Sequence, residues 1–181
     1  MSTDLCVRDI AVVALLLICL LSDVKSRRIP NWATLPGIAL GLMLNLVLGG
    51  WPGLRMSAIG AGVGFGALFL LFMLGWMGGG DVKLMAAIGA LKGYPFVVSA
   101  LVYSILVGGF IGIAVLVWNR RFWPAMKGIA LFLLSRVFRS IPTHELDPEK
   151  MQKVPFGIAI VVGTVWAGVV SHFAGPLWPF M

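Results

Sequence analysis

Apolar residues occur along the chain in long blocks, which short polar or glycine-rich segments separate. A block of about twenty apolar residues is long enough to cross a membrane as a helix. The pattern predicts six such helices, at residues 10–21, 32–48, 56–76, 84–91, 96–118 and 154–173. The fourth block is the shortest and has a lysine at each end. The segment "GGWPG" at 49–53 predicts a turn between the second and third helices.

The composition places the chain among membrane proteins. Of its 181 residues, 60% are hydrophobic and 12% are charged, whereas a soluble domain carries roughly 25% charged residues. No linker rich in Pro, Gly or Ser separates the apolar blocks. We therefore expect an all-α, polytopic transmembrane helix bundle of about six spans, folded as a single membrane-embedded domain over residues 1–181.

The basic residues predict the orientation of this bundle. A net charge of +7 could indicate a nucleic-acid partner, but the Lys and Arg residues cluster in two segments, 23–31 and 119–150. Such clusters mark cytoplasmic loops, so we expect contact with membrane lipid and no nucleic-acid partner. Counting spans from these loops places the N-terminus outside. Within the second loop, residues 126–141 predict an amphipathic helix in the membrane interface.

The residue types that often serve as metal ligands or nucleophiles predict no site here. Cys6 and Cys19 make no CxxC pair, and His144 and His172 lie far apart in the sequence, so we expect no metal and no other cofactor. The segment "GAGVGFG" at 60–66 lies inside an apolar block and is not followed by GK[ST]. It therefore predicts close helix packing and not a phosphate-binding loop.

Two of the seven acidic residues stand out by position. Five belong to the N-terminal tail or the second basic loop: Asp4, Asp9, Glu145, Asp147 and Glu149. Asp23 and Asp81 lie at membrane boundaries, both on the expected cytoplasmic side. An ionised carboxylate there is costly without a partner or a function. Asp23 could be a helix-end charge neutralised by nearby basic residues, and Asp81 could cap the fourth helix.

The two aspartates would carry chemistry if they lie close together. Like charges a few ångströms apart cannot both ionise, so the pair would share a proton. One carboxylate could then act as general base on a water molecule while the other protonates a carbonyl or a leaving amine. The glycines before Asp81 would let a substrate backbone approach closely.

Three segments resemble signatures of the type IV prepilin peptidases. "DVKSRRIPN" at 23–31 resembles the first signature, in which Ile-Pro-Asn follows an aspartate. "GGGDVKLMAAIG" at 78–89 resembles the second, GxGD followed by Lys-Leu, and "VPFGIAIVVG" at 154–163 resembles a C-terminal Pro-Phe-Gly segment. Presenilin-type intramembrane proteases share GxGD, and the Ile-Pro-Asn element separates the two groups.

The resemblance implies a membrane-embedded aspartic endopeptidase whose catalytic pair is Asp23 and Asp81. Such enzymes cleave the basic leader of prepilins or pseudopilins at the cytoplasmic face of the inner membrane, usually after a glycine. Pro30 and Asn31 are expected to end one helix and cap the next, while Lys83 either adjusts the charge of the pair or reaches to the interface. The motif residues that would support the pair are Lys25, Ile29, Pro30, Asn31, Gly78, Gly80, Lys83, Leu84, Pro155 and Gly157.

The resemblance is to the short form of the family. Bifunctional members add an N-terminal domain with paired CxxC motifs, which we do not find, so we expect no N-methyltransferase activity. The short form occurs with tight-adherence (Flp-type) pili. An archaeal-type preflagellin peptidase, a proton- or cation-coupled transport component and an inactive assembly subunit are the alternatives. The sequence fixes neither the particular prepilin nor the oligomeric state.

Overall fold

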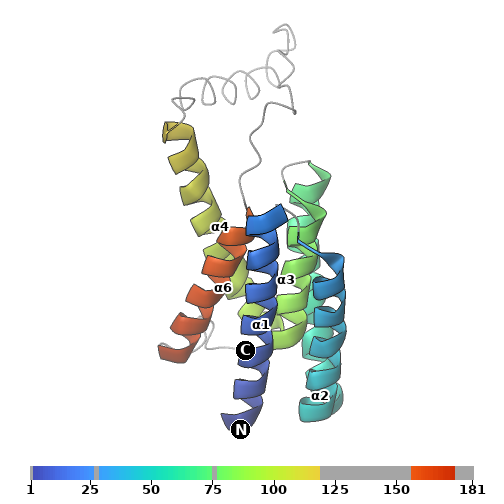
Figure 1. Cartoon of the computed structure of the whole chain (residues 1–181). Helices are drawn as coiled ribbons and strands as arrows, with labels where there is room; N and C mark the ends of the chain where they lie inside the picture. The colour runs from blue at the N-terminus through green and yellow to red at the C-terminus, as the bar shows by residue number, and fades with distance from the viewer. Residues whose placement is uncertain (1, 27–28, 75–76, 119–155, 174–181) are drawn as a thin grey trace, which may run out of the picture. The chain divides into compact units, whose positions relative to one another are not determined.

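The structure is a computed structural model that describes residues 2–26, 29–74, 77–118 and 156–173 (Figure 1). These residues form five helices: α1 (Ser2–Ser26), α2 (Asn31–Met73), α3 (Gly79–Lys92), α4 (Tyr94–Trp118) and α6 (Phe156–Phe173). The regular structure of these residues is helical throughout, which confirms the all-α class. The amphipathic helix expected at 126–141 lies outside the described residues.

The chain divides into two compact units. The first comprises Met1–Gly108 together with Pro155–Met181, and the second comprises Gly109–Val154. Of the second unit, the structure describes residues 109–118, which continue α4 as helix. Both candidate catalytic aspartates and the helices around them belong to the first unit.

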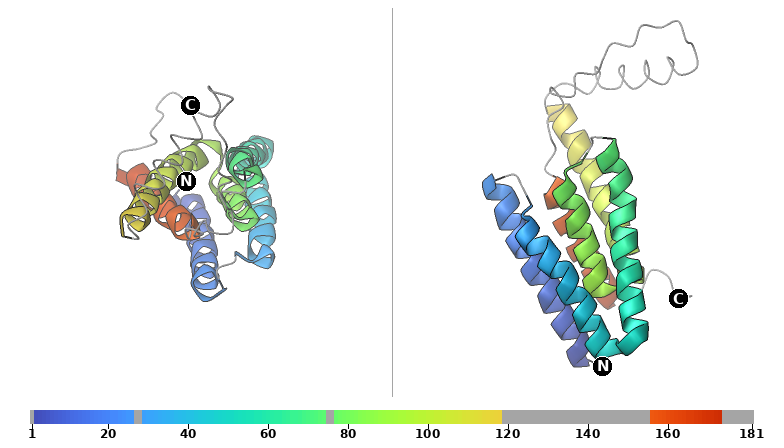
Figure 2. Two further views of the ribbon diagram at one scale, coloured as in Figure 1. Left: turned by 90° about the horizontal axis from the view of Figure 1, so that it is seen from above. Right: turned by 90° about the vertical axis from the view of Figure 1, so that its right-hand side faces the viewer.

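Three of the described helices are long and apolar enough to cross a membrane: Asn31–Met73, Tyr94–Val115 and Phe156–Phe173. The first of these is interrupted at Gly50, whose φ of 59° and ψ of −151° are not helical. Its two arms run antiparallel on either side of this break (Figure 2). The predicted turn at 49–53 is therefore confirmed. The spans predicted at 32–48 and 56–76 correspond to the two arms of α2, the second of which ends at Met73, before the predicted end, while residues 75–76 lie outside the described residues.

Helix α3 lies between the arms of α2 and makes its most extensive contacts with them (Figure 2). Nine of its 14 residues are buried. A helix of this length is roughly 21 Å long, shorter than the ~30 Å hydrocarbon core of a bilayer. The predicted helix at 84–91 thus exists and begins earlier than expected, at Gly79, as the central element of the bundle.

Glycines bring the second arm of α2 into backbone contact with α3. A Cβ atom built on Gly64 would lie 2.6 Å from the Met85 carbonyl oxygen, and one built on Gly60 would overlap the carbonyl oxygen of Gly89. A Cβ atom on Gly62 would meet no atom within 4 Å. The close packing predicted for 60–66 is confirmed for the face that carries Gly60 and Gly64, as in small-xxx-small contacts generally.

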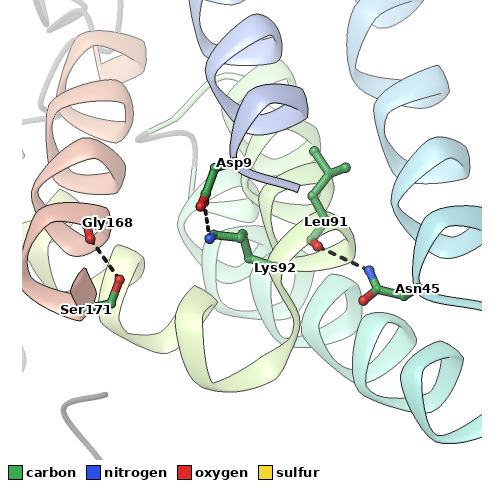
Figure 3. A network of polar contacts seen from close by, with 6 residues as sticks. All are labelled: Asp9, Asn45, Leu91, Lys92, Gly168 and Ser171. Carbon is green, nitrogen blue, oxygen red and sulfur yellow. Dashed lines mark hydrogen bonds and ion pairs between the residues drawn. The ribbon is translucent and has the colours of Figure 1, made fainter. Parts of the chain in front are cut away.

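Side chains of both α2 arms satisfy the carbonyl groups at the C-terminal end of α3. The Asn45 amide donates to the Leu91 carbonyl oxygen at 3.1 Å (Figure 3). It also donates to the Ala90 carbonyl oxygen at 2.9 Å, as does the Ser57 hydroxyl. Helix ends leave such carbonyls without an intrahelical partner. Gly93, with a φ of 84°, then ends the helix.

An ion pair joins the same end of α3 to α1. The Lys92 ammonium contacts the Asp9 carboxylate (Figure 3) and lies 5.0 Å from the centroid of the Phe96 ring. The expectation that Asp4 and Asp9 belong to an N-terminal tail is wrong, because α1 begins at Ser2 and includes both. The apolar block at 10–21 gave no sign of these two extra helical turns.

The glycine contact predicts opposite effects for two neighbouring positions of one helix. Gly64→Ala should destabilise the protein by about 1–3 kcal/mol, because the added methyl group forces α2 away from α3. Gly62→Ala should leave stability unchanged or raise it slightly, because alanine favours the helix. Thermal unfolding in detergent micelles measures both variants. Equal unfolding temperatures for the two would show that this α2–α3 contact is wrong.

Candidate active site

Asp23 and Asp81 lie on neighbouring helices at the end of the bundle opposite the Asp9–Lys92 ion pair. Asp23 is in the last turn of α1 and Asp81 in the first turn of α3, and both side chains are partly buried. The negative charge of Asp23 raises the pKa of Asp81. The structure therefore brings the two carboxylates within electrostatic reach, although 57 residues separate them in the chain.

The environment of Asp81 favours its protonated form. Asp81 lies outside the three helices that are long enough to cross a membrane. Burial is the larger cause that raises its pKa, and the charge of Asp23 adds to it, while a hydrogen bond with the Gly78 backbone lowers it. A carboxyl group that keeps its proton beside a second, ionisable carboxyl group can donate that proton in a reaction.

Asp81 does not cap α3. The N-cap residue is Gly78, in an extended conformation with φ −78° and ψ 144°, and the Asp81 N–H donates to its carbonyl oxygen at 3.1 Å. Asp81 is the third residue of the helix, where an acidic side chain faces the N–H groups of the first turn. The interpretation of Asp81 as an N-cap is wrong.

The first turn of α6 lies against Asp23. A Cβ atom built on Gly157 would lie 2.6 Å from the Asp23 Oδ2 atom and 3.1 Å from its Cγ atom. A side chain at this position would require the Asp23 carboxylate to move. The segment at 154–163 therefore contributes to the site with its backbone, and its Pro155 lies outside the described residues.

Ile29 contacts α3, which carries Asp81, and α6, which lies against Asp23. A Cβ atom on Gly80 would lie 2.8 Å from the Ile29 Cβ atom, and one on Gly157 would lie 3.5 Å from the Ile29 Cδ1 atom. Glycines in α3 and α6 thus form a seat for this side chain, which we call the Ile29 seat. All three segments that carry the family resemblance meet there.

Asn31 and Lys83 form a polar contact that the sequence did not suggest. Pro30 is the N-cap residue of α2, with φ −77° and ψ 134°, and no side chain caps this end. Of the two residues expected to end one helix and cap the next, Pro30 occupies the N-cap position, whereas Asn31 is the first residue of the helix and does not cap it. Instead, the Lys83 ammonium donates to the Asn31 Oδ1 atom at 2.9 Å.

Two further motif residues, Leu84 and Lys25, lie in the core and at the surface. Leu84 is fully buried in the core, and Lys25 is exposed near the end of α1. Within the described ranges, no group of three or more His, Cys, Asp or Glu residues could hold a metal ion. Sequence reasoning missed Asn45 and Ser57, whose only signal was a lone polar residue in an otherwise apolar block.

The fold is an apolar α-helical bundle of a membrane protein, with two interacting carboxyl groups at one end. Comparison with known proteins identifies the family to which the chain belongs. The type IV leader peptidase family matches residues 10–113, which include both aspartates, Ile29, Asn31 and Lys83. Because the match covers more than half of the chain, the protein belongs to this family.

Curated relatives carry the name prepilin leader peptidase/N-methyltransferase. That of Aeromonas hydrophila is 38% identical over 104 residues, covering 52% of this chain and 34% of the relative. That of Neisseria gonorrhoeae is 40% identical over 98 residues, covering 50% of this chain and 32% of the relative. That of Bacillus subtilis (strain 168) is 30% identical over 158 residues, covering 86% of this chain and 52% of the relative. The chain thus spans a third to a half of these relatives' length. No solved structure matches it significantly.

The proximity of the carboxylates predicts a coupled titration. Asp23→Asn should lower the pKa of Asp81, because it removes the neighbouring negative charge that disfavours ionisation, while burial still holds the value above that of an ordinary aspartate. Carbon-13 NMR of aspartate-labelled protein in micelles measures the titration. Asp9→Asn, at the other end of α1, is the control. An Asp81 pKa that does not respond to Asp23→Asn would contradict the geometry.

Proposed function

We propose that this protein is a membrane-embedded aspartic endopeptidase that removes the basic leader peptide of type IV prepilins or pseudopilins. The observation that carries the proposal is the interaction of the Asp23 and Asp81 carboxylates, in a chain that belongs to a leader peptidase family. The names of its relatives support the prepilin as substrate, since each is called a prepilin leader peptidase.

The pair would hydrolyse the peptide bond by general acid–base catalysis. One ionised carboxylate takes a proton from a water molecule, whose oxygen attacks the scissile carbonyl carbon. The protonated partner donates its proton to the carbonyl oxygen, which gives a gem-diol intermediate. The carboxyl group that took the water proton then passes it to the amide nitrogen, while its partner takes a proton back from the gem-diol. The C–N bond breaks, leaving a carboxylic acid on the leader and an amine on the shortened pilin. The raised pKa of Asp81 favours Asp81 as the protonated partner.

The active site would lie at the cytoplasmic face of the cytoplasmic (inner) membrane. In this arrangement α1, the two arms of α2, α3, α4 and α6 provide six segments, and the N-terminus is outside. Helices α1 and α3 are antiparallel, because Asp9 meets Lys92 at one end and Asp23 interacts with Asp81 at the other. Both aspartates therefore share one edge, next to the basic segment 23–31, which the positive-inside rule assigns to the cytoplasm.

Two finer features of the proposal rest on the sequence. A substrate of the Flp type follows from the resemblance to short family members. The names of the relatives also include an N-methyltransferase activity, and its absence from this protein stays a prediction. A proton- or cation-coupled transporter is the second candidate function, but carboxylates at helix ends favour hydrolysis over a path through the membrane centre.

The proposal predicts that neither aspartate can be replaced. Asp23→Asn and Asp81→Asn should each lower the rate of prepilin cleavage at least about 100-fold, because asparagine keeps the side-chain size and removes the transferable proton. Cleavage of a co-expressed prepilin, followed by gel shift, measures the effect, and Asp9→Asn is the matched control at the other end of the bundle. Cleavage at the wild-type rate by either active-site variant would exclude the two-aspartate mechanism. Preflagellin in place of prepilin tests the archaeal-type alternative.

The backbone contact at Asp23 predicts a graded loss. Gly157→Ala should lower the cleavage rate about 10- to 100-fold, because the methyl group would displace a catalytic carboxylate. Gly168→Ala in the same helix meets open space and should cleave like wild type. Initial rates at matched amounts of inserted protein measure both. Equal rates for the two variants would mean that α6 does not position Asp23.

A further inference from the structure

The hydrogen bond between Lys83 and Asn31 joins α3 to α2 close to Asp81 in the sequence. Lys83 follows Asp81 by two residues in α3, and Asn31 is the first residue of α2. Their contact spans 52 residues of sequence and is exposed. An exposed polar contact contributes little to stability. Its effect is therefore to fix the position of α3 relative to α2.

Asp81 and Lys83 contact different neighbours. Residues two apart in a helix do not share a face. Asp81 interacts with Asp23 of α1, whereas Lys83 donates to Asn31 of α2. Residues 81–83 of α3 are thus held from two sides, and a rotation of α3 that broke the Lys83 contact would also move the Asp81 carboxyl group.

Residues 29 and 31 both contact the N-terminal part of α3. Ile29 occupies the seat that Gly80 and Gly157 form, and Asn31 accepts the hydrogen bond from Lys83. The Gly157 backbone lies against both Ile29 and the Asp23 carboxylate, so these contacts extend to the end of α1. The two catalytic helices are therefore set against each other through residues 29–31.

The hydrogen bond of Lys83 is made to α2 and not to the aspartates. The ammonium group is directed to a neutral amide oxygen. This leaves the contact with Asn31 as the role for Lys83 that the geometry shows.

We propose that Lys83 and Asn31 form a positioning pair, which holds the two aspartates in their reactive arrangement through the Lys83–Asn31 hydrogen bond. The proposal rests on the peptidase function proposed above. The pair itself takes no part in proton transfer. Its loss should therefore slow the chemical step and leave prepilin binding and the ionisation of the aspartates as they are.

Steady-state cleavage of purified prepilin tests the pair. Lys83→Met and Asn31→Ala should each lower kcat about 10- to 100-fold with an unchanged KM, since small displacements of reacting groups have effects of this size. The double variant should lose no more than the single variants, because both remove one contact. Asn31→Asp keeps an acceptor oxygen and should restore most of kcat. Asn31→Ala and Asn31→Asp leave α3 unaltered, so they test the contact even if Lys83→Met folds poorly.

Lys92→Met is the matched control, because it removes a lysine of the same helix and breaks the ion pair at the far end. It should change the unfolding temperature and leave kcat unchanged. Losses that multiply in the double variant, or a wild-type kcat in Asn31→Ala, would overturn the positioning pair. So would a shifted pH profile in Lys83→Met, which would reveal a charge effect. A wild-type protein that cuts no prepilin would instead overturn the proposed function, and the positioning pair with it.

Discussion

The backbone contact between α2 and α3 is the constraint on which the rest of the structure depends. Helix α3 is too short to cross a bilayer alone, and its buried residues face neighbours on several sides. In lipid, apolar side chains gain little from leaving one apolar medium for another, so close packing has to hold helices together. Gly60 and Gly64 permit that packing, while Asn45 and Ser57 satisfy the carbonyl groups that the short helix would otherwise leave unpaired.

The position of the site follows from this arrangement. With α3 held between the arms of α2, its N-terminal turn lies where α1 ends. That turn carries Asp81, and the end of α1 carries Asp23. The glycines at 80 and 157 then let Ile29 and the Asp23 carboxylate approach the backbones of α3 and α6. A pair of interacting carboxyl groups at one end of the bundle thus results from helix packing, and burial together with the charge of Asp23 raises the pKa of Asp81.

Much of this could be read from the sequence, because its signals were local. Apolar blocks predicted the helices, "GGWPG" predicted the break in α2, and glycines spaced four apart predicted the α2–α3 contact. Contacts between distant segments could not be read in this way. Asn31 has the side chain of a helix cap, yet its oxygen accepts from Lys83, and Asp81 in turn occupies the third position of α3 behind Gly78. Asp9 had the appearance of a tail residue because its partner, Lys92, lies 83 residues away.

The central claim is that two coupled carboxyl groups share one catalytic proton, and the pH dependence of prepilin cleavage by the purified protein tests it most directly. At low pH both groups are protonated and no base is available, while at high pH both are ionised and no acid is available. The account predicts a bell-shaped profile of kcat/KM, whose alkaline limb lies above the range of an ordinary aspartate because burial and Asp23 raise the pKa of Asp81. A rate that rises with pH to a plateau through the neutral and alkaline range would contradict it, since no shared proton would then be required.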